Sequence, residues 1–253
     1  MGEYQIKATV RYDGGGFAGW QIQPDVRTVQ GEIERVLSLI ASEPVSILGA
    51  SRTDAGVHAL GQVFCFKWKS VPPLTRLRKS ISQMLSPEVR IESMDVVEDD
   101  FHPIYSAVRK KYAYSFSLAT EPDPFSSRHA WRLPRHTDVE MMAQLGQRLV
   151  GTHDFAGYRC LGGSVKTTVR TLHSVEVMKG GVVGPQDADD LWRIEFVGNG
   201  FMYKMVRNLM GTLVDIARGH FPESRLDELL ESPGPFAGQT APACGLFLVK
   251  VDY

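Results

Sequence analysis

The side chain with the clearest chemical potential is the carboxylate of Asp54, which stands two residues after Arg52 among small, turn-forming residues. Apolar runs at 45–48 and 63–68 predict a strand on either side of it. A loop between two strands is a rigid platform for a catalytic acid. The same carboxylate could instead accept backbone N–H bonds and stiffen the turn. From spacing alone, both interpretations stand.

Other sequence patterns that carry chemistry are absent. The glycines at 14–16 are not followed by the Gly-Lys-Ser/Thr of a phosphate-binding loop, and they do not form a dinucleotide fingerprint. His58, His102 and His153 lack metal-ligand spacing, so we expect structural or surface roles for them. The three cysteines include no CxxC pair. What remains is a lone carboxylate with an arginine nearby.

Two further segments place cations beside apolar or aromatic residues. The cluster Arg109-Lys110-Lys111 precedes Tyr112 and Tyr114, which share one face of a predicted strand. The two tyrosines either pack in the core, or they offer a ring on which a base stacks while the neighbouring cations hold phosphate.

Arg207 occupies an otherwise apolar helical pattern. It either extends to solvent or pairs with an acid from elsewhere in the chain, and Asp54 is the acid we consider first.

Composition restricts the class of protein. With 253 residues, 43% apolar and 23% charged, the chain fits one large domain or two modest lobes. A net charge of -1 argues against indiscriminate binding of nucleic acid but leaves room for a local basic surface. No apolar run is long enough to span a bilayer, the first residues lack a secretory pattern, and the few cysteines suit a reducing cytoplasm.

Periodicity predicts an α+β protein with mainly antiparallel pairing. We expect strands at 4–12, 89–97, 111–118, 170–178, 191–198 and 245–251, and helices from 28, after 73, at 137–150, at 201–218 and before 232. Thr137 and Glu140 predict a capping box, and 119–136 is typical of a connector.

These segments together resemble the TruA family of tRNA pseudouridine synthases over almost the whole chain. The resemblance rests on the segments 11–14, 17–21, 27–30, 52–59, 151–155, 201–211 and 241–246. Ser51 stands where the family usually has glycine, and Gly15 where it usually has threonine. Neither departure removes a group expected to act in catalysis.

The resemblance implies a pseudouridine synthase fold, with a mainly antiparallel sheet flanked by helices and two similar lobes around a central cleft. Residues 1–105 would form the N-terminal lobe with the Asp54 loop, and residues 106–253 the lobe with Tyr112 and Arg207. It also implies a homodimer that binds the anticodon arm of tRNA and modifies uridines at positions 38, 39 and 40. Neither a metal nor an organic cofactor is expected.

By the same resemblance, Asp54 is the nucleophile that helps break the N1–C1′ bond of uridine before C5 is joined to C1′. Attack on the base, attack on the sugar and a glycal intermediate all remain open. Tyr112 would stack on uracil and assist proton removal from C5, while Arg207 would pair with Asp54. Arg52 would hold or replace the flipped nucleotide, and Leu246 would line the pocket.

Two basic clusters are candidates for contacts to the RNA backbone, with a solvated protein surface as the alternative for each. They comprise Arg76, Arg78 and Lys79 on the helix after 73, and Arg109, Lys110 and Lys111. Two rival functions also stand at this point. One is a noncatalytic RNA-binding protein, and the other is a pseudouridine synthase that acts on another structured RNA.

Overall fold

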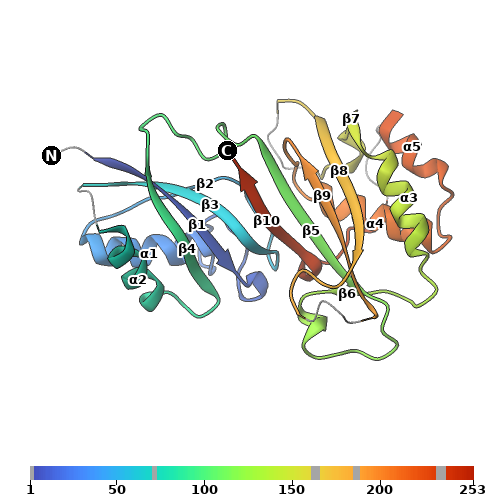
Figure 1. The fold of residues 1–253 in the computed structure, drawn as a ribbon, viewed down its shortest axis with the longest axis horizontal. Coiled ribbons are helices and arrows are strands. Elements are labelled where there is room, and N and C mark those ends of the chain that lie inside the picture. The colour runs from blue at the N-terminus through green and yellow to red at the C-terminus, as the bar shows by residue number, and fades with distance from the viewer. Residues whose placement is uncertain (1–2, 70–72, 161–165, 185–188, 232–237) are drawn as a thin grey trace. The chain divides into compact units, whose positions relative to one another are not determined.

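The computed structural model describes residues 3–69, 73–160, 166–184, 189–231 and 238–253 (Figure 1). These residues form ten strands and five α-helices, and the strand pairing is mostly antiparallel. The predicted α+β class is therefore confirmed. The chain divides into two compact units, of which the first contains Met1–Val108 and Leu248–Tyr253 and the second contains Arg109–Phe247. In the described residues, no helix is long and apolar enough to cross a membrane.

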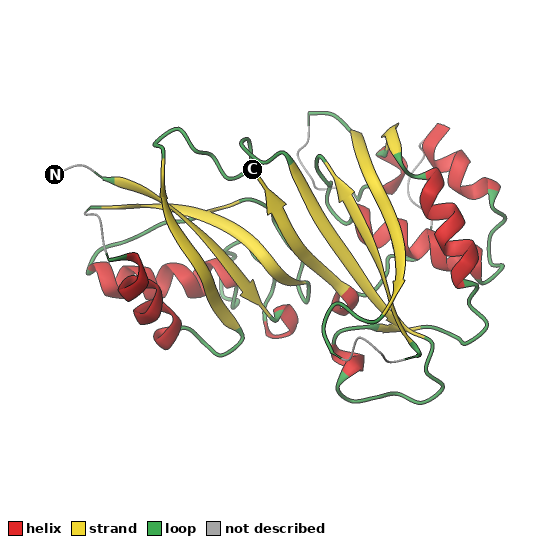
Figure 2. Ribbon diagram, in the orientation of Figure 1, coloured by secondary structure: helices red, strands yellow, loops and turns green. Residues whose placement is uncertain are grey.

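The first unit is built on a sheet whose strands run in the order β4, β1, β3 and β10, and β1 pairs antiparallel with both β4 and β3. Their bounds are β4 (Val89–Val97), β1 (Tyr4–Tyr12), β3 (His58–Trp68) and β10 (Leu246–Asp252), and β2 (Leu48–Gly49) also pairs with β3. Helices α1 (Val29–Ala41) and α2 (Leu74–Met84) lie on the same face of this sheet (Figure 2). Helix α1 begins where the sequence predicts, because the Thr28 hydroxyl accepts the Gly31 N–H at 3.2 Å.

Strand β10 crosses the boundary between the units. Its first two residues belong to the second unit, and 248–252 belong to the first. In the first unit the Val108 N–H donates to the Asp252 carbonyl at 2.8 Å. A Cβ on Gly61 of β3 would lie 2.5 Å from the Val249 carbonyl oxygen, so the two backbones approach closely.

The second unit contains the antiparallel order β5, β9, β8 and β7. Its elements are β5 (Arg109–Ser117), β6 (Trp131–Arg132), α3 (Val139–Arg148), β7 (Gly151–Asp154), β8 (Val169–Lys179), β9 (Leu191–Gly198), α4 (Met205–Ala217) and α5 (Ser224–Glu231). Helix α3 packs against β8 and α4 (Figure 1). Every residue of α4 except Arg207 is buried, as expected for a helix that is apolar nearly all round.

The structure corrects several element ends. The predicted capping box is wrong: the Asp138 carboxylate caps α3 by accepting the Met141 N–H at 2.9 Å, and the Thr137 hydroxyl donates to the Pro134 carbonyl. Helix α4 begins at Met205, four residues after the predicted start. Strand β3 begins at His58 and not at 63, because its ladder with β1 reaches back along the chain as far as 59.

Candidate active site

Asp54 lies in the loop between β2 and β3, so the predicted placement between two strands is confirmed, although the strand before it is Leu48–Gly49 and not 45–48. Its side chain is partly exposed. The turn that follows is closed by the Val57 N–H, which donates to the main-chain oxygen of Asp54 at 3.1 Å. Gly56 supplies the positive φ of 78° that this turn requires. Because a main-chain oxygen closes the turn, this bond does not require an acidic side chain at position 54.

A second loop, residues 13–20, holds the Asp54 loop through main-chain hydrogen bonds. The Trp20 N–H donates to the Thr53 carbonyl at 3.1 Å, and the Gly56 N–H donates to the Phe17 carbonyl at 3.3 Å. The Tyr12 and Thr53 hydroxyls add a buried hydrogen bond of 2.8 Å. The loop therefore has partners on both sides of Asp54.

Two glycines permit this close approach. A Cβ at Gly14 would lie 1.9 Å from the Val57 carbonyl oxygen, a distance that no side chain tolerates. Gly19 has φ of 100°, and its Cβ would lie 2.7 Å from the Thr53 carbonyl oxygen. The sequence around these glycines does not indicate the contacts, because they join residues about forty positions apart.

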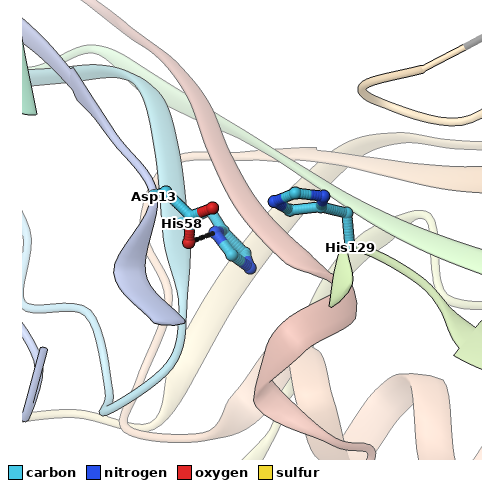
Figure 3. Close-up of side chains that lie close together, drawn as sticks. All are labelled: Asp13, His58 and His129. Atoms are coloured by element: carbon cyan, nitrogen blue, oxygen red, sulfur yellow. Dashed lines mark ion pairs between the residues drawn. The ribbon is translucent and has the colours of Figure 1, made fainter. Parts of the chain in front are cut away.

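His58 joins the same two loops from a buried position (Figure 3). Its Nδ1 atom lies 3.1 Å from the Asp13 carboxylate and 3.1 Å from the Gly14 nitrogen. A neutral Nδ1 accepts the Gly14 N–H, whereas a protonated Nδ1 would donate to Asp13. The expectation of a structural role for His58 fits this burial. Figure 3 also draws His129, a residue of the second unit.

Gln62 is a further positioning residue that sequence reasoning missed. It is fully buried, and its amide group donates to the Ser51 carbonyl at 2.6 Å. The bond ties the start of the Asp54 loop to β3. Arg52, which follows Ser51, is exposed. The sequence signal for this hydrogen bond is a glutamine within an otherwise apolar strand, because a buried polar side chain needs a hydrogen-bond partner.

In the second unit, Tyr112 is buried on β5 beside Phe196 of β9. Its ring meets the Phe201 ring edge-on, with centroids 4.9 Å apart. Tyr114 shares this strand face and is fully buried, with its hydroxyl donating to the Pro242 carbonyl at 2.7 Å. Burial and this hydrogen bond give Tyr114 a place in the core.

Arg207 is held at the start of α4 by the segment before β10. Its Nε atom donates to the Ala241 carbonyl at 2.8 Å, and the Ala241 N–H donates back to the Arg207 carbonyl at 3.1 Å. Leu246 follows five residues later and is buried. The helix and this segment thus fix the guanidinium, which is partly exposed.

The three consecutive cations of β5 have different surroundings. Burial lowers the pKa of Lys110 to about 8. Lys111 points to the opposite face by strand alternation and forms an ion pair with Glu195. Glu195 also accepts from Arg193 Nε at 3.0 Å. Arg109 is exposed.

Two of the three α2 cations, Arg78 and Lys79, border a depression in the surface of the first unit. Arg76 and Lys79 are exposed, while Arg78 is partly buried and donates to the Glu92 carbonyl at 3.4 Å. The lining residues include Arg78, Lys79 and Arg90 together with serine, threonine and glutamine side chains. This composition suits an anion, and Arg90 is partly neutralised by Glu92, whose carboxylate lies 3.3 Å from its Nε.

Comparison with known proteins defines the class of this molecule. Residues 8–106 and 145–253 match the model of the tRNA pseudouridine synthase family. The chain belongs to this family, as the resemblance predicted. Among curated relatives, a tRNA pseudouridine synthase A of an Exiguobacterium species is 37% identical over 98% of each chain. A tRNA pseudouridine synthase A of Lactococcus lactis is 39% identical over 98% of this chain and 97% of its own.

The predicted site residues fall in both units. Asp54 and Arg52 share the loop of the first unit, and Tyr112, Arg207 and Leu246 belong to the second. The ion pair between Asp54 and Arg207 stays a prediction. No three metal-ligating side chains of one unit gather among the residues the structure describes.

Proposed function

We propose that this protein isomerises uridine to pseudouridine at positions 38, 39 and 40 of the tRNA anticodon stem and loop, as a cytoplasmic homodimer. One observation carries the enzymatic part: a member of this family holds a partly exposed carboxylate, Asp54, on a loop clamped from both sides. A clamped acid is what nucleophilic catalysis requires, because a displacement of about 1 Å can cost two orders of magnitude in rate.

Asp54 acts as the nucleophile in the proposed reaction. The N1–C1′ bond of uridine breaks, the uracil rotates and C5 bonds to C1′. C5 then loses its proton, N1 takes one up, and Asp54 is released unchanged, so the product is an isomer of the substrate. Tyr112 stacks on the uracil and assists this proton transfer. Arg207 keeps Asp54 ionised and oriented, because a cation beside a carboxylate favours its charged form.

Binding of the target nucleotide falls to other residues. Arg52, exposed on the same loop as Asp54, holds or replaces the flipped nucleotide, and Leu246 lines the pocket. Cations of α2 and β5 contact the backbone phosphates: Arg76, Arg78, Lys79, Arg109, Lys110 and Lys111. Among these, Lys111 has to leave its ion pair with Glu195 to reach a phosphate.

The decisive experiment is release of tritium from tRNA that carries 5-tritiated uridine. The parent protein releases tritium, and Asp54→Ala and Asp54→Asn lose at least about a thousandfold in rate while binding tRNA like the parent. The Asn variant is the closer control, because it keeps the shape of the side chain. Tight binding without release by the parent would favour the rival RNA-binding function.

Two further measurements test the finer claims. Pseudouridine mapping in cells that lack the protein should show its loss at positions 38–40, and retained modification there would point to another structured RNA. Arg207→Ala should reduce turnover more than tRNA affinity, whereas equal losses would place Arg207 on the RNA-contact surface. Light scattering should give the mass of two chains.

A further inference from the structure

Lys204 adopts a backbone conformation that its side chain disfavours. It stands immediately before α4 with φ of 59° and ψ of 5°. Among the described non-glycine residues, only Asp25 and Ser42 also have positive φ, and Ser42 is the residue that ends α1. A glycine would take the conformation of Lys204 without strain. Strained backbone of this kind concentrates at functional sites.

The chain around Lys204 carries cations and no acids. Residues 196–214 contain Lys204 and Arg207 but no aspartate or glutamate. Residues 155–175 likewise contain no acid, and they carry Arg159, Lys166 and Arg170. An acid-free basic stretch is the electrostatic pattern of a surface that binds polyanions.

The two acid-free stretches lie against each other. The Cys160 N–H donates to the Tyr203 carbonyl at 3.3 Å, and the Asn199 N–H donates to the Thr171 carbonyl at 3.0 Å. Arg170 lies along Gly200, where a Cβ would come within 3.5 Å of its Nε. The two segments that carry these cations therefore lie side by side in the second unit.

An exposed aromatic ring stands among these cations. Tyr203 is 44% exposed, and the Lys204 ammonium lies 5.2 Å from its ring centroid. Within the described part of the chain, Lys204 forms no ion pair, whereas Lys179 of the same unit pairs with Asp189 at 3.4 Å. An aromatic face beside a cation is what proteins offer to an unpaired nucleotide and its phosphate.

We propose that Tyr203 and Lys204, with Arg159 beside them, form a binding surface for the RNA backbone. The Lys204 ammonium holds a phosphate, the Tyr203 ring packs on the adjacent nucleotide, and Arg159 holds a second phosphate. The N–H groups at the start of α4 and the neighbouring Arg170 add favourable potential for the anion. This inference rests on the proposed function for its ligand, tRNA, and names residues that the proposal above does not use.

The test is the salt dependence of tRNA affinity. The salt slope is the steepness with which log K falls as log salt rises. Each lost phosphate contact reduces this slope by about 0.7–0.9 and weakens binding about equally for all sequences. Lys204→Ala and Arg159→Ala should each lower the slope by this amount and raise Kd about tenfold at low salt. Lys179→Ala is the matched control and should keep the parental slope. Parental slopes for both Lys204→Ala and Arg159→Ala would overturn the proposal.

Two more variants separate charge from strain and stacking. Lys204→Gly relieves the strained backbone, so its thermal midpoint should not fall below that of the parent, yet its slope should fall as in Lys204→Ala. Tyr203→Leu should raise Kd about fivefold or more with an unchanged slope, because it removes stacking and no charge. If Lys204→Gly binds tRNA like the parent, the Lys204 ammonium does not hold a phosphate.

These binding measurements need no turnover, so they are separable from the proposed function. If the parent releases no tritium but Lys204→Ala still lowers the salt slope, the surface stands and the enzymatic proposal fails. If the parent releases tritium while Lys204→Ala and Arg159→Ala keep its salt slope, the enzymatic proposal stands and the surface fails.

Discussion

Asp54 of the first unit and Arg207 of the second are held by different means. The Asp54 loop is clamped by main-chain groups of another loop, residues 13–20, with glycines at the closest contacts. Arg207 instead projects from a helix whose other residues are all buried. The acid thus depends on the shape of two backbones, and the cation depends on the packing of a whole helix.

Because the two residues are held differently, mutations near them should have different effects. A loop held by close contacts can lose its geometry while the rest of its unit stays folded. A buried helix cannot move without disturbing the core around it. Changes at the loop should therefore act first on catalysis, and changes in the helix first on stability.

Among changes that leave the proposed catalytic residues intact, the largest effect is expected for Gly14→Ala, which disrupts the contact between the two loops. The new Cβ would lie 1.9 Å from the Val57 carbonyl oxygen, so one loop must shift. We expect kcat/KM for tritium release to fall roughly 100-fold. Gly15→Ala is the control, since its Cβ meets only the end of the Asp13 side chain at 3.1 Å. Equal losses in the two variants would contradict the clamp.

Gly211→Ala tests the helix side of the comparison. Helix propensity alone predicts that alanine stabilises α4 by about 1 kcal/mol. The structure predicts the opposite, because the Cβ would lie 1.6 Å from the Gln239 carbonyl oxygen. We expect the free energy of unfolding to fall by about 1–3 kcal/mol, measured by denaturant titration. A more stable variant would show that this contact yields easily.

Lys110 gives a pH-dependent prediction for the second unit. Burial lowers its pKa to about 8, so raising the pH through this value removes its charge while ordinary lysines stay charged. If Lys110 contacts phosphate, tRNA affinity should fall a fewfold between about pH 7 and 9. Lys110→Arg should abolish this fall, because arginine keeps its charge.

The same pKa sets the sign of a stability effect. Between about pH 8 and the ordinary lysine value, 10.5, the unfolded chain binds more protons at this site than the folded chain. The contribution of Lys110 to the free energy of unfolding therefore rises with pH in this range. Thermal unfolding of the parent and Lys110→Met across the range would measure it, and parallel curves would contradict the shifted pKa.

The smallest effect is expected for the exposed contacts that Arg27 makes with the loop of residues 13–20 and with Glu88. Arg27 lies over the Phe17 ring, 4.2 Å from its centroid, and makes two hydrogen bonds to Glu88 of 3.1 and 3.2 Å. Hydrogen bonding from Arg27 lowers the pKa of Glu88 to about 2. Arg27 is exposed and Glu88 is partly exposed, so solvent screens the pair and Glu88→Gln should cost less than about 1 kcal/mol.

The sign of this effect with pH is also fixed. Because the pKa of Glu88 is lowered, its stabilisation is present above the ordinary value, 4.5, and is lost as the pH falls through about 2. The difference in unfolding free energy between the parent and Glu88→Gln should shrink over this range. A constant difference would mean that packing, and not charge, is lost.

Periodic segments of the fold could be predicted from the sequence. Strands β4 and β9 have the predicted bounds, and the loop position of Asp54 follows from the apolar runs beside it. The start of α4 could not be predicted, because an αL lysine leaves no local signal. Nor could the N-cap of α3, where Thr137 and Asp138 are adjacent residues of similar capping strength.

The candidate site residues could be predicted from the sequence, but the contacts that hold them in place could not. The Asp54 segment and its family likeness could be read directly. The clamp at Gly14, the buried His58 and the tie from Gln62 join residues up to about 44 positions apart, which periodicity cannot detect. The roles of Asp54, Tyr112 and Arg207 stay predictions until they are measured.

The path of β10 has a consequence for synthesis on the ribosome. Residues 248–252 complete the sheet of the first unit, yet they are translated only after the whole of 109–247. The sheet beneath the Asp54 loop therefore stays one strand short while the second unit emerges. A chain that ends before residue 246 would leave β3 without its β10 neighbour, and an unpaired strand edge is a site where other chains can pair.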